Sequence, residues 1–409
     1  MKLVHYIILI SLLSTGCVTK NNSGLKIEVH NDASIGISDA VIRISDPVML
    51  EEIDALPGKY FQVRSDTIHP VQQIREDEKL KELLFLSDIG PGEKKVFTIS
   101  KTETETVFKQ RTQAELSIRK GGEWKGRIYE GGKFENVSFL RVPDEHTDHS
   151  FFIRYEGPGW ESDKVGYRFY LDWRNAADIF GKKVDTLVLQ DVGQDGFDSY
   201  HEIGPWGVDV LKVGESLGIG SIGYWLNDKA ERVAVTDSIY CEINYSGILE
   251  SRITTTYFGW AVGDHKTNLI SKLSIQAGSR MTRHDLEVSD ALDNLCTGIV
   301  KLPDAEYIIP ESAKGEWTWL ATYGKQTLQN DLLGMAILYK TKDLIRLAED
   351  EDDWAVILKP SENKLTYYYL AAWEQEPGGI KSKHEFVDYL NVQTEVLNNR
   401  PTVKIINSK

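Results

Sequence analysis

The stretch that most constrains the fold of this chain runs from Gly157 to Gly207. Within it, residues 165–175 alternate as a β-strand does, which places one set of side chains on each face. One face is apolar and is expected to be buried: Val165, Tyr167, Phe169, Leu171 and Trp173. The other face carries Gly166, Arg168, Tyr170, Asp172 and Arg174. Because unpaired charged groups cost several kcal/mol each to bury, this second face must form a paired network or line a wet cleft.

Two tight turns flank this segment, and each carries a tryptophan. Gly157-Pro158-Gly159-Trp160 precedes it, and Gly204-Pro205-Trp206-Gly207 follows it. A tryptophan on a turn does not easily reach a core, and the face of an indole ring stacks well on a sugar. The turns therefore favour the wet cleft, with Trp160 and Trp206 as platforms for a sugar ring.

The run from Phe152 to Gly207 resembles a family of bacterial lipoproteins encoded in polysaccharide-utilisation loci, which includes the ulvan oligosaccharide dehydratases. The matching words are IRYEGPGWESDKVGYRFYLDWRNAADIFGK and, more weakly, DSYHEIGPWG. The resemblance covers the chain from about Leu25 onward. It implies a mutarotase-like β-super-sandwich and a carbon–oxygen lyase. Such a lyase would remove water from the non-reducing-end uronic acid of acidic, ulvan-type oligosaccharides and leave a 4,5-unsaturated uronate.

Residues 1–17 predict a lipoprotein signal peptide with its cleavage box. Lys2 supplies a positive start, an apolar run extends from Tyr6 to Leu13, and Leu13-Ser14-Thr15-Gly16-Cys17 reads as the box. The apolar run is too short to span a bilayer. Cleavage is expected to leave a lipid on Cys17, followed by a tether over residues 18–24. No acidic cluster of the kind that resembles a surface-export signal follows Cys17, so an outer-membrane anchor facing the periplasm is expected.

The remaining cysteines, Cys241 and Cys296, would lie in an oxidising compartment, where a disulfide or two buried free thiols are the alternatives. No Cys/His spacing suggests zinc, and no cofactor is expected. The segment Asp191-Val192-Gly193-Gln194-Asp195-Gly196, with Asp198 after it, could hold Ca²⁺ through its carboxylates. Its spacing is not that of an EF-hand, and a Gly-rich β-turn explains it without a metal.

A chain of 409 residues is too long for one small core, so two domains are expected. Residues 25–110 read as a small β-sandwich, and the polar residues 101–113 as a linker. Strand patterning dominates residues 115–409, which predict a large β-sandwich that forms the catalytic domain. Within it, short helices are expected at residues 289–295 and 381–390.

The formal net charge of −15 argues against nucleic acid as a partner. It also argues against unaided attraction of a polyanionic glycan. An acidic oligosaccharide would therefore need a local basic cluster on this chain.

The reaction that the resemblance implies requires a group that neutralises the carboxylate, a base that takes H5 and an acid that protonates the 4-hydroxyl. Arg174 or Arg168, helped by Asn175, is the expected carboxylate clamp, because a guanidinium binds a carboxylate through two hydrogen bonds. The alternative is that one of these arginines forms a structural ion pair with Asp172.

Tyr170 and His201 are expected to share the acid and base roles. An ordinary half-exposed aromatic residue is the alternative for Tyr170, and His201 is a weak signal without the resemblance. A histidine in the loop 144–149, His149, either joins the cleft, binds a metal or lies on solvated surface. Arg283 and His284 fall in an expected strand and point to opposite faces, so at most one of them joins any site.

Two other functions compete with the dehydratase. A polysaccharide lyase would use similar residues to expel the glycosidic oxygen instead of water. A non-catalytic glycan-binding lipoprotein would use Trp160 and Trp206 as stacking platforms, and it would have no need for phenol, imidazole and guanidinium groups to converge.

Overall fold

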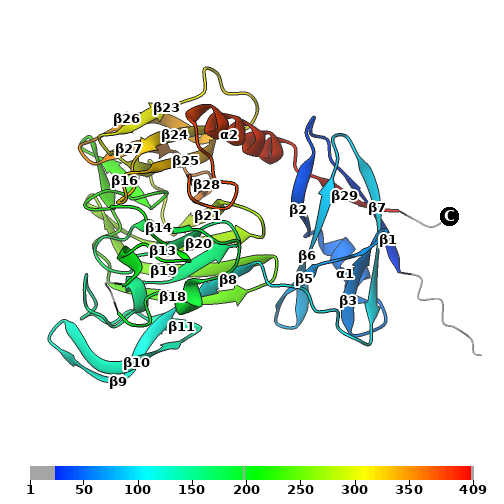
Figure 1. The fold of residues 1–409 in the computed structure, drawn as a ribbon, viewed down its shortest axis with the longest axis horizontal. Coiled ribbons are helices and arrows are strands. Elements are labelled where there is room, and N and C mark those ends of the chain that lie inside the picture. Colours follow the sequence, from blue (N-terminus) through cyan, green and yellow to red (C-terminus); the bar gives the residue numbers. More distant parts are fainter. Residues whose placement is uncertain (1–23, 197–198, 407–409) are drawn as a thin grey trace, which may run out of the picture.

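The computed structural model describes residues 24–196 and 199–406, which fold into a mostly β protein with a small and a large part (Figure 1). The predicted fold class, a small β-sandwich followed by a large β-super-sandwich, is confirmed. The signal peptide predicted for residues 1–17, with Cys17, and tether residues 18–23 lie outside the described residues. No described helix is long and apolar enough to cross a membrane.

The small part is a sandwich of two antiparallel sheets. Alternating residues point inward from both sheets and form its core, for example Ile27 and Phe97 from one sheet and Ile42 and Phe85 from the other. One sheet has the order β29 (Thr402–Ile405), β1 (Leu25–His30), β7 (Lys94–Thr102), β3 (Tyr60–Arg64) and β4 (Ile68–His69). The other has the order β2 (Ile37–Ile44), β6 (Lys79–Ile89) and β5 (Val71–Glu76). Helix α1 (Pro47–Asp54) begins at Asp46, whose side chain accepts from Met49 N.

The end of the chain returns to this small sandwich, which corrects the predicted domain boundary. Strand β29 pairs with β1, with Val403 opposite Val29. The large domain therefore does not extend to residue 409 as predicted, because residues 402–405 complete a sheet of the small one. A four-residue strand carries little signal in sequence, and its partner lies almost the whole chain away.

The large part is built around a nine-stranded antiparallel sheet, faced by two five-stranded sheets (Figure 1). The nine strands are, in order, β11 (Phe139–Arg141), β18 (Ser238–Ser246), β19 (Glu250–Val262), β20 (His265–Gln276), β21 (Met281–Val288), β28 (Lys364–Trp373), β25 (Leu332–Lys340), β24 (Trp317–Lys325) and β23 (Ala305–Ile308). One facing sheet is β15 (Gly207–Asp209), β14 (Ala177–Lys182), β13 (Gly166–Phe169), β12 (Gly159–Ser162) and β8 (Thr112–Glu115). The other is β17 (Lys229–Arg232), β16 (Gly223–Leu226), β22 (Leu295–Val300), β27 (Asp353–Leu358) and β26 (Leu344–Glu349).

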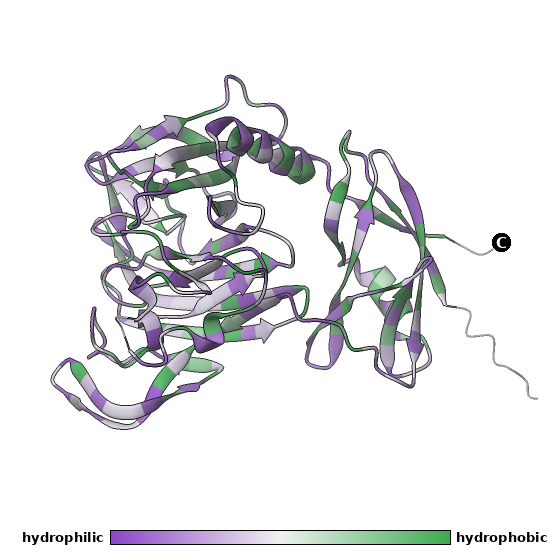
Figure 2. Cartoon of the chain, viewed as in Figure 1, coloured by the Kyte–Doolittle hydropathy of each residue, from purple (hydrophilic) through white to green (hydrophobic). Residues whose placement is uncertain are grey.

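The main core lies between these sheets, and helix α2 (Lys383–Asn398) covers part of the outer face. Phe386, Leu390 and Leu397 of α2 pack against Trp319 and Ala321 of β24. Polar and apolar residues alternate along α2 as expected for a half-covered helix (Figure 2). A helix at residues 381–390 was predicted and is confirmed, although it is longer. The helix predicted at residues 289–295 is wrong, since that segment is a bend before β22.

The two parts of the chain are joined by polar contacts and a small apolar cluster. Arg111, at the end of the linker, binds Asp39 of β2 and Asp163 of the large part. Gln72 of β5 accepts from the backbone of Leu249 and Glu250. The interface thus ties the linker to both sandwiches.

We expect limited proteolysis to cut within residues 103–110, because nearly all of this segment is exposed and none of it lies in a strand. The two fragments should still elute together on size exclusion, because β29 of the C-terminal fragment completes the sheet of the N-terminal one. Fragments that separate without denaturant would contradict the docking of the two sandwiches.

A two-stranded arm projects from the large sandwich: β9 (Ser117–Lys125) and β10 (Ile128–Asn136) (Figure 1). It bends where Gly122 faces Gly131, and a Cβ on Gly122 would lie 2.3 Å from Glu130 O. Trp124 and Tyr129 of the arm pack on Phe152 of the body. The arm is therefore docked on residues 150–153 near its tip as well as at its base, where Ile118 pairs with Ile153.

Cys241 and Cys296 are both buried free thiols, so of the two alternatives the disulfide is not formed. Cys241 lies on β18 and Cys296 on β22, which belong to different sheets. Burial raises the pKa of both thiols, and Cys241 reaches about 12. Both therefore behave as small apolar core residues at neutral pH.

Candidate active site

The predicted strand 165–175 is a strand only at Gly166–Phe169 (β13), and its polar face is covered rather than wet. After Phe169 the chain turns: Asp172 Oδ1 accepts from Arg174 N, and Asn175 has a φ of 43°. This turn leaves Trp173 41 % exposed, although the alternation predicted it to be buried. Residues before and after β13 fold over its polar face. They form one apolar cluster, which consists of Tyr155, Phe180, Leu189, Val192 and Tyr200.

Arg168 lies at the centre of what we call the inner cluster: Arg168, Tyr170, Asp178, Tyr200 and Asp209. Arg168 faces Asp178 across the β13–β14 pair, and its Nη2 lies 2.7 Å from Asp178 Oδ2 and 2.5 Å from Asp209 Oδ2. Its Nη1 donates to the Tyr200 hydroxyl at 3.1 Å. Tyr170 donates to Asp178. Burial and the nearby charge of Asp178 raise the pKa of Asp209 well above its usual range.

Arg174 lies at the centre of a second group, the outer cluster: Asp148, Glu156, Asp172 and Arg174. Its guanidinium lies 3.0 Å from Asp148 Oδ1 and 3.0 Å from Glu156 Oε1, and it also binds Asp172. The Tyr170 ring lies between the two clusters, with Arg174 Cζ 3.8 Å and Arg168 Cζ 4.8 Å from its centroid. Both guanidinium groups thus make a cation–π contact with the same aromatic ring, which links the two clusters.

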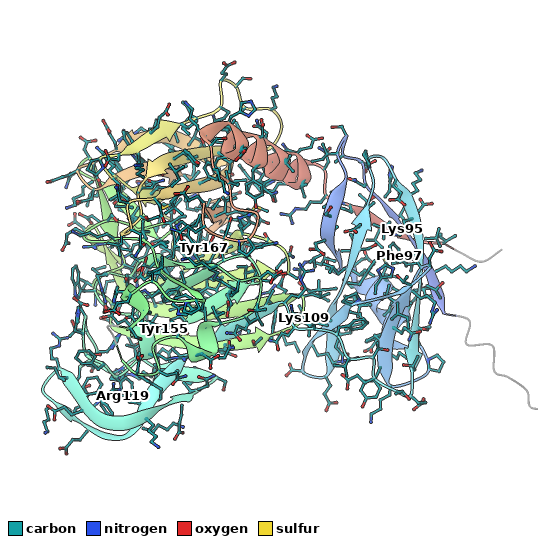
Figure 3. All side chains as sticks on the ribbon, viewed as in Figure 1. Lys95, Phe97, Lys109, Arg119, Tyr155 and Tyr167 are labelled. Atoms are coloured by element: carbon teal, nitrogen blue, oxygen red, sulfur yellow. The ribbon has the colours of Figure 1, made fainter. Side chains whose placement is uncertain are left out.

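A small pocket opens beside these clusters, between the arm and the body. Figure 3 labels Arg119 on the arm and Tyr155 in the body next to it. The lining residues are Arg119, Phe134, His149, Phe151, Ile153, Tyr155, Glu156, Gly193, Gly196 and Tyr200. Tyr155, Glu156 and Tyr200 are buried and form the floor, whereas His149 is exposed.

Four residues that line this pocket have a backbone in the left-handed region: His149 (φ 57°), Phe151 (60°), Tyr155 (40°) and Glu156 (71°). Each such conformation costs a non-glycine residue about 1–2 kcal/mol. Strain of this kind persists only where the surrounding structure holds it, and it gathers at functional sites. The strained backbone conformations therefore gather at the same pocket as the two charged clusters.

His201 follows Tyr200, a residue that lines this pocket, on a short 3-10 turn, Ser199–His201. Its side chain is 32 % exposed, and its Nε2 lies 3.4 Å from Asp209 Oδ2. Its ring lies 4.5 Å from that of Tyr200. A half-exposed imidazole next to a buried carboxylate is an arrangement that suits proton transfer.

Several predicted substrate contacts are corrected by burial. Trp160 is 1 % exposed because Gly159–Ser162 is an inner strand, β12, and its indole N–H donates to Thr282 Oγ1. Asn175 is fully buried and donates to Tyr257. Arg168 and Tyr170 are buried in the inner cluster and, unlike Tyr200, do not line the pocket, so neither can contact a substrate directly.

The two arginines form structural ion pairs, which was the alternative to a substrate clamp, because each is bound by carboxylates of the protein. Arg174 pairs with Asp172, and two further carboxylates complete its surroundings. Neither Arg174 nor Arg168 is therefore available as a carboxylate clamp in this structure. They position the residues around the pocket instead.

Arg283 and His284 do point to opposite faces of β21, but neither reaches the pocket. His284 is buried between the sheets, with Nε2 2.7 Å from Ser271 Oγ and its Nδ1 3.2 Å from Gly220 O. Burial lowers its pKa to about 4. Arg283 pairs with Asp285 at 2.8 Å.

Trp206 is half-buried against Phe180, with ring centroids 6.0 Å apart. It belongs to the apolar cluster that contains Tyr200, so its proposed stacking role remains a prediction. In the segment considered for Ca²⁺, Asp195 accepts from Ser199 Oγ at 2.5 Å. No group of three ligating side chains within residues 24–196 and 199–406 includes Asp191 or Asp195, and Asp198 lies outside those ranges.

Sequence reasoning missed Arg119, Glu156, Tyr200, Asp178 and Asp209. Asp178 could have been found, because residues 168 and 178 are cross-strand partners in a hairpin and carry opposite charges. Tyr200 stands next to His201 in the word DSYHEIGPWG. Arg119 and Glu156 carry no comparable signal, since the arm and the turn that bring them to the pocket follow from tertiary packing.

The chain matches the family described as a domain of unknown function (DUF4861) over residues 29–403. No curated protein matches it in sequence. Among solved structures, it is similar to a glycosyl hydrolase family 38 protein from Enterococcus faecalis, at 8 % identity and a TM-score of 0.45, over 94 % of this chain and 48 % of that one. An alpha-mannosidase from Enterococcus faecalis V583 gives 9 % and 0.45, over 95 % of this chain and 46 % of that one. A putative kojibiose phosphorylase from the human microbiome gives 12 % and 0.34, over 58 % and 32 %. The chain thus spans about half the length of the first two.

Proposed function

The chain belongs to the DUF4861 family, and from the chemistry of its site we propose that it is a carbon–oxygen lyase that removes water from the terminal uronic acid of acidic oligosaccharides. The observation that carries this proposal is that a phenol and an arginine, Tyr200 and Arg119, line one pocket, while His201, paired with Asp209, packs directly against the Tyr200 ring. Stacking platforms suffice for a glycan-binding protein, whereas elimination from a uronate needs a base, an acid and a cation.

Arg119 is the group that we assign to the substrate carboxylate. It lines the pocket, and no carboxylate of the described residues pairs with it; its guanidinium lies 4.9 Å from the Phe134 ring. The arm on which it lies carries five basic and three acidic residues over residues 117–136, in a chain whose net charge is −15. The arm therefore supplies the local basic cluster that an acidic glycan requires.

His201 is the group that we assign to the proton on C5. Asp209, at 3.4 Å, orients the ring and stabilises its protonated form. As H5 leaves, its electron pair forms the C4–C5 double bond and the C4–O bond breaks. The negative charge that develops on the carboxylate during this step is balanced by Arg119.

Tyr200 is the group that we assign to the leaving hydroxyl. Burial raises the pKa of its phenol, so it stays protonated at neutral pH and has a proton to give. Arg168 donates to its oxygen at 3.1 Å, which stabilises the phenolate formed when the proton passes to the departing water. His201 and Tyr200 thus form a base and an acid on neighbouring residues, and Tyr170 and Arg168 hold them from behind.

Incubation with uronate-terminated oligosaccharides tests this proposal. We expect ultraviolet absorbance to rise as the unsaturated uronate forms, and the product to lose the mass of one water without becoming shorter. Release of shorter sugars with the same absorbance would assign a polysaccharide lyase instead. Binding without any absorbance change would leave a glycan-binding protein.

A further inference from the structure

Three ligating side chains lie close together beside the pocket, between its buried floor and the exposed His149: Asp148, His149 and Glu156. One ligand atom of each lies within 4.8 Å of the others. Two atoms bound to one transition-metal ion can be up to about 4.4 Å apart, because the bonds from the metal to oxygen or nitrogen are about 2.0–2.2 Å long. A shift of a few tenths of an ångström would therefore bring all three to a common ion.

The charges around these residues do not balance. In the outer cluster, Asp148, Asp172 and Glu156 face the single guanidinium of Arg174, which leaves two formal negative charges uncompensated. The neighbouring inner cluster does not supply them, since Arg168 is matched by two carboxylates. Uncompensated charge in a largely buried group is costly, and a divalent cation would remove it.

One carboxylate oxygen of Glu156 indicates where a positive charge that balances the outer cluster would bind. Glu156 is 3 % exposed and lines the pocket. Its Oε1 accepts from His149 N at 2.9 Å and lies 3.0 Å from Arg174, whereas Oε2 has no hydrogen-bond partner among the described residues. A buried carboxylate oxygen normally finds a partner, so an unpartnered one indicates a ligand.

We propose that Asp148, His149 and Glu156 bind one divalent transition-metal ion, such as Mn²⁺ or Zn²⁺, beside the pocket. Two carboxylates with one imidazole favour such an ion over Ca²⁺ or Mg²⁺, which prefer oxygen ligands alone. Arg174 keeps Asp172 and Glu156 Oε1, so Glu156 can offer Oε2 without losing its present partners.

The imidazole of His149 is already in place for this ion. Its Nδ1 lies 2.7 Å from Asp148 Oδ1, and binding of the ion would displace the proton that these two atoms share. The ion would also place positive charge where a substrate carboxylate enters. This last role rests on the proposed function, whereas the binding of the ion does not.

Calorimetric titration of the full chain, freed of metal with a chelator and studied without any sugar, tests the proposal. We expect one Mn²⁺ or Zn²⁺ per chain and a higher Tm on binding. Glu156→Gln keeps the shape of the side chain, and His149→Gly suits a backbone at φ 57°, so both variants should fold. Each should weaken the affinity at least about tenfold.

His384→Ala is the matched control, because His384 also pairs with a carboxylate, Asp388 at 2.9 Å, but lies on exposed helix surface. It should bind the ion as the unaltered chain does. Absence of binding to the unaltered chain, undiminished binding by both variants, or binding of Ca²⁺ in preference to Mn²⁺ and Zn²⁺ would each overturn the proposal. Because no turnover is measured, these outcomes are independent of whether the chain is a lyase.

Discussion

His201→Ala is expected to lower kcat on uronate-terminated oligosaccharides by about 10²–10⁴-fold, the usual cost of losing a positioned acid or base. KM should change little, because the carboxylate of the substrate is held elsewhere, by Arg119. The fold should survive, since His201 lies on a surface turn and its side chain is 32 % exposed. Initial rates of absorbance increase, measured over a range of substrate concentrations, separate the two constants.

His265→Ala is a suitable control, because His265 is an exposed histidine at the start of β20 and does not line the pocket. It should keep the rate of the unaltered chain. A near-native kcat in His201→Ala, with the control also active, would show that His201 is not the base. His149, the other accessible imidazole at the pocket, would then take its place.

Arg168→Met is expected to destabilise the fold by about 3–5 kcal/mol near neutral pH, the largest loss we expect from any one substitution here. It removes the single cation between Asp178 and Asp209, both of which are buried. Methionine fills much of the volume, so the loss comes from two carboxylates left without a counter-charge rather than from a cavity. Urea unfolding measures it.

This loss should shrink as the pH falls. In the unaltered protein, burial and Asp178 already raise the pKa of Asp209 above its unfolded value. Removing the arginine raises it further, so the folded variant takes up protons at a higher pH than the unfolded chain does. A carboxyl group with a raised folded pKa favours folding at low pH and loses that contribution as the pH rises through the folded pKa. Unfolding at about pH 5 should therefore show a smaller difference from the unaltered chain than unfolding at about pH 7.5.

Arg346→Met is the matched control for this measurement. Arg346 pairs with Asp228 at 3.4 Å, but both side chains are mostly exposed. Such surface pairs contribute about 0–1 kcal/mol, so this variant should be nearly as stable as the unaltered chain at both pH values. Equal losses in the two variants would mean that the inner cluster is open to solvent and does not hold the turn of His201.

The polar face of residues 165–175 could be predicted only in part from the sequence. The strand alternation established that Arg168, Tyr170, Asp172 and Arg174 had to form a paired network or line a cleft, because no third environment tolerates such side chains. The choice between the two depended on Asp178 and Asp209, which come from strands β14 and β15, and on Asp148 and Glu156, which come from separate turns. Nothing in the alternation of one strand reveals whether such partners arrive from elsewhere.

The burial of Trp160 also could not be predicted from the residues next to it. Glycine and proline beside Trp160 predicted a turn, yet the residue itself lies in a buried strand, β12. Turn residues fix where a chain changes direction to within a residue or two, and a shift of that size decides whether an indole faces solvent or the opposing sheet.

The sequence by itself determined the mostly β fold, a small sandwich ahead of a large one, and one of the chain segments that contribute to the candidate site. These follow from local alternation and turn chemistry, which each short segment carries within itself. Tertiary structure alone decided which charges are paired. It also brought Arg119, His149 and Glu156 to one pocket and placed His201 beside Tyr200, which lines that pocket. The physical reason is that pairing and access depend on contacts between residues distant in sequence, whose geometry is set only when the sheets pack and the arm docks.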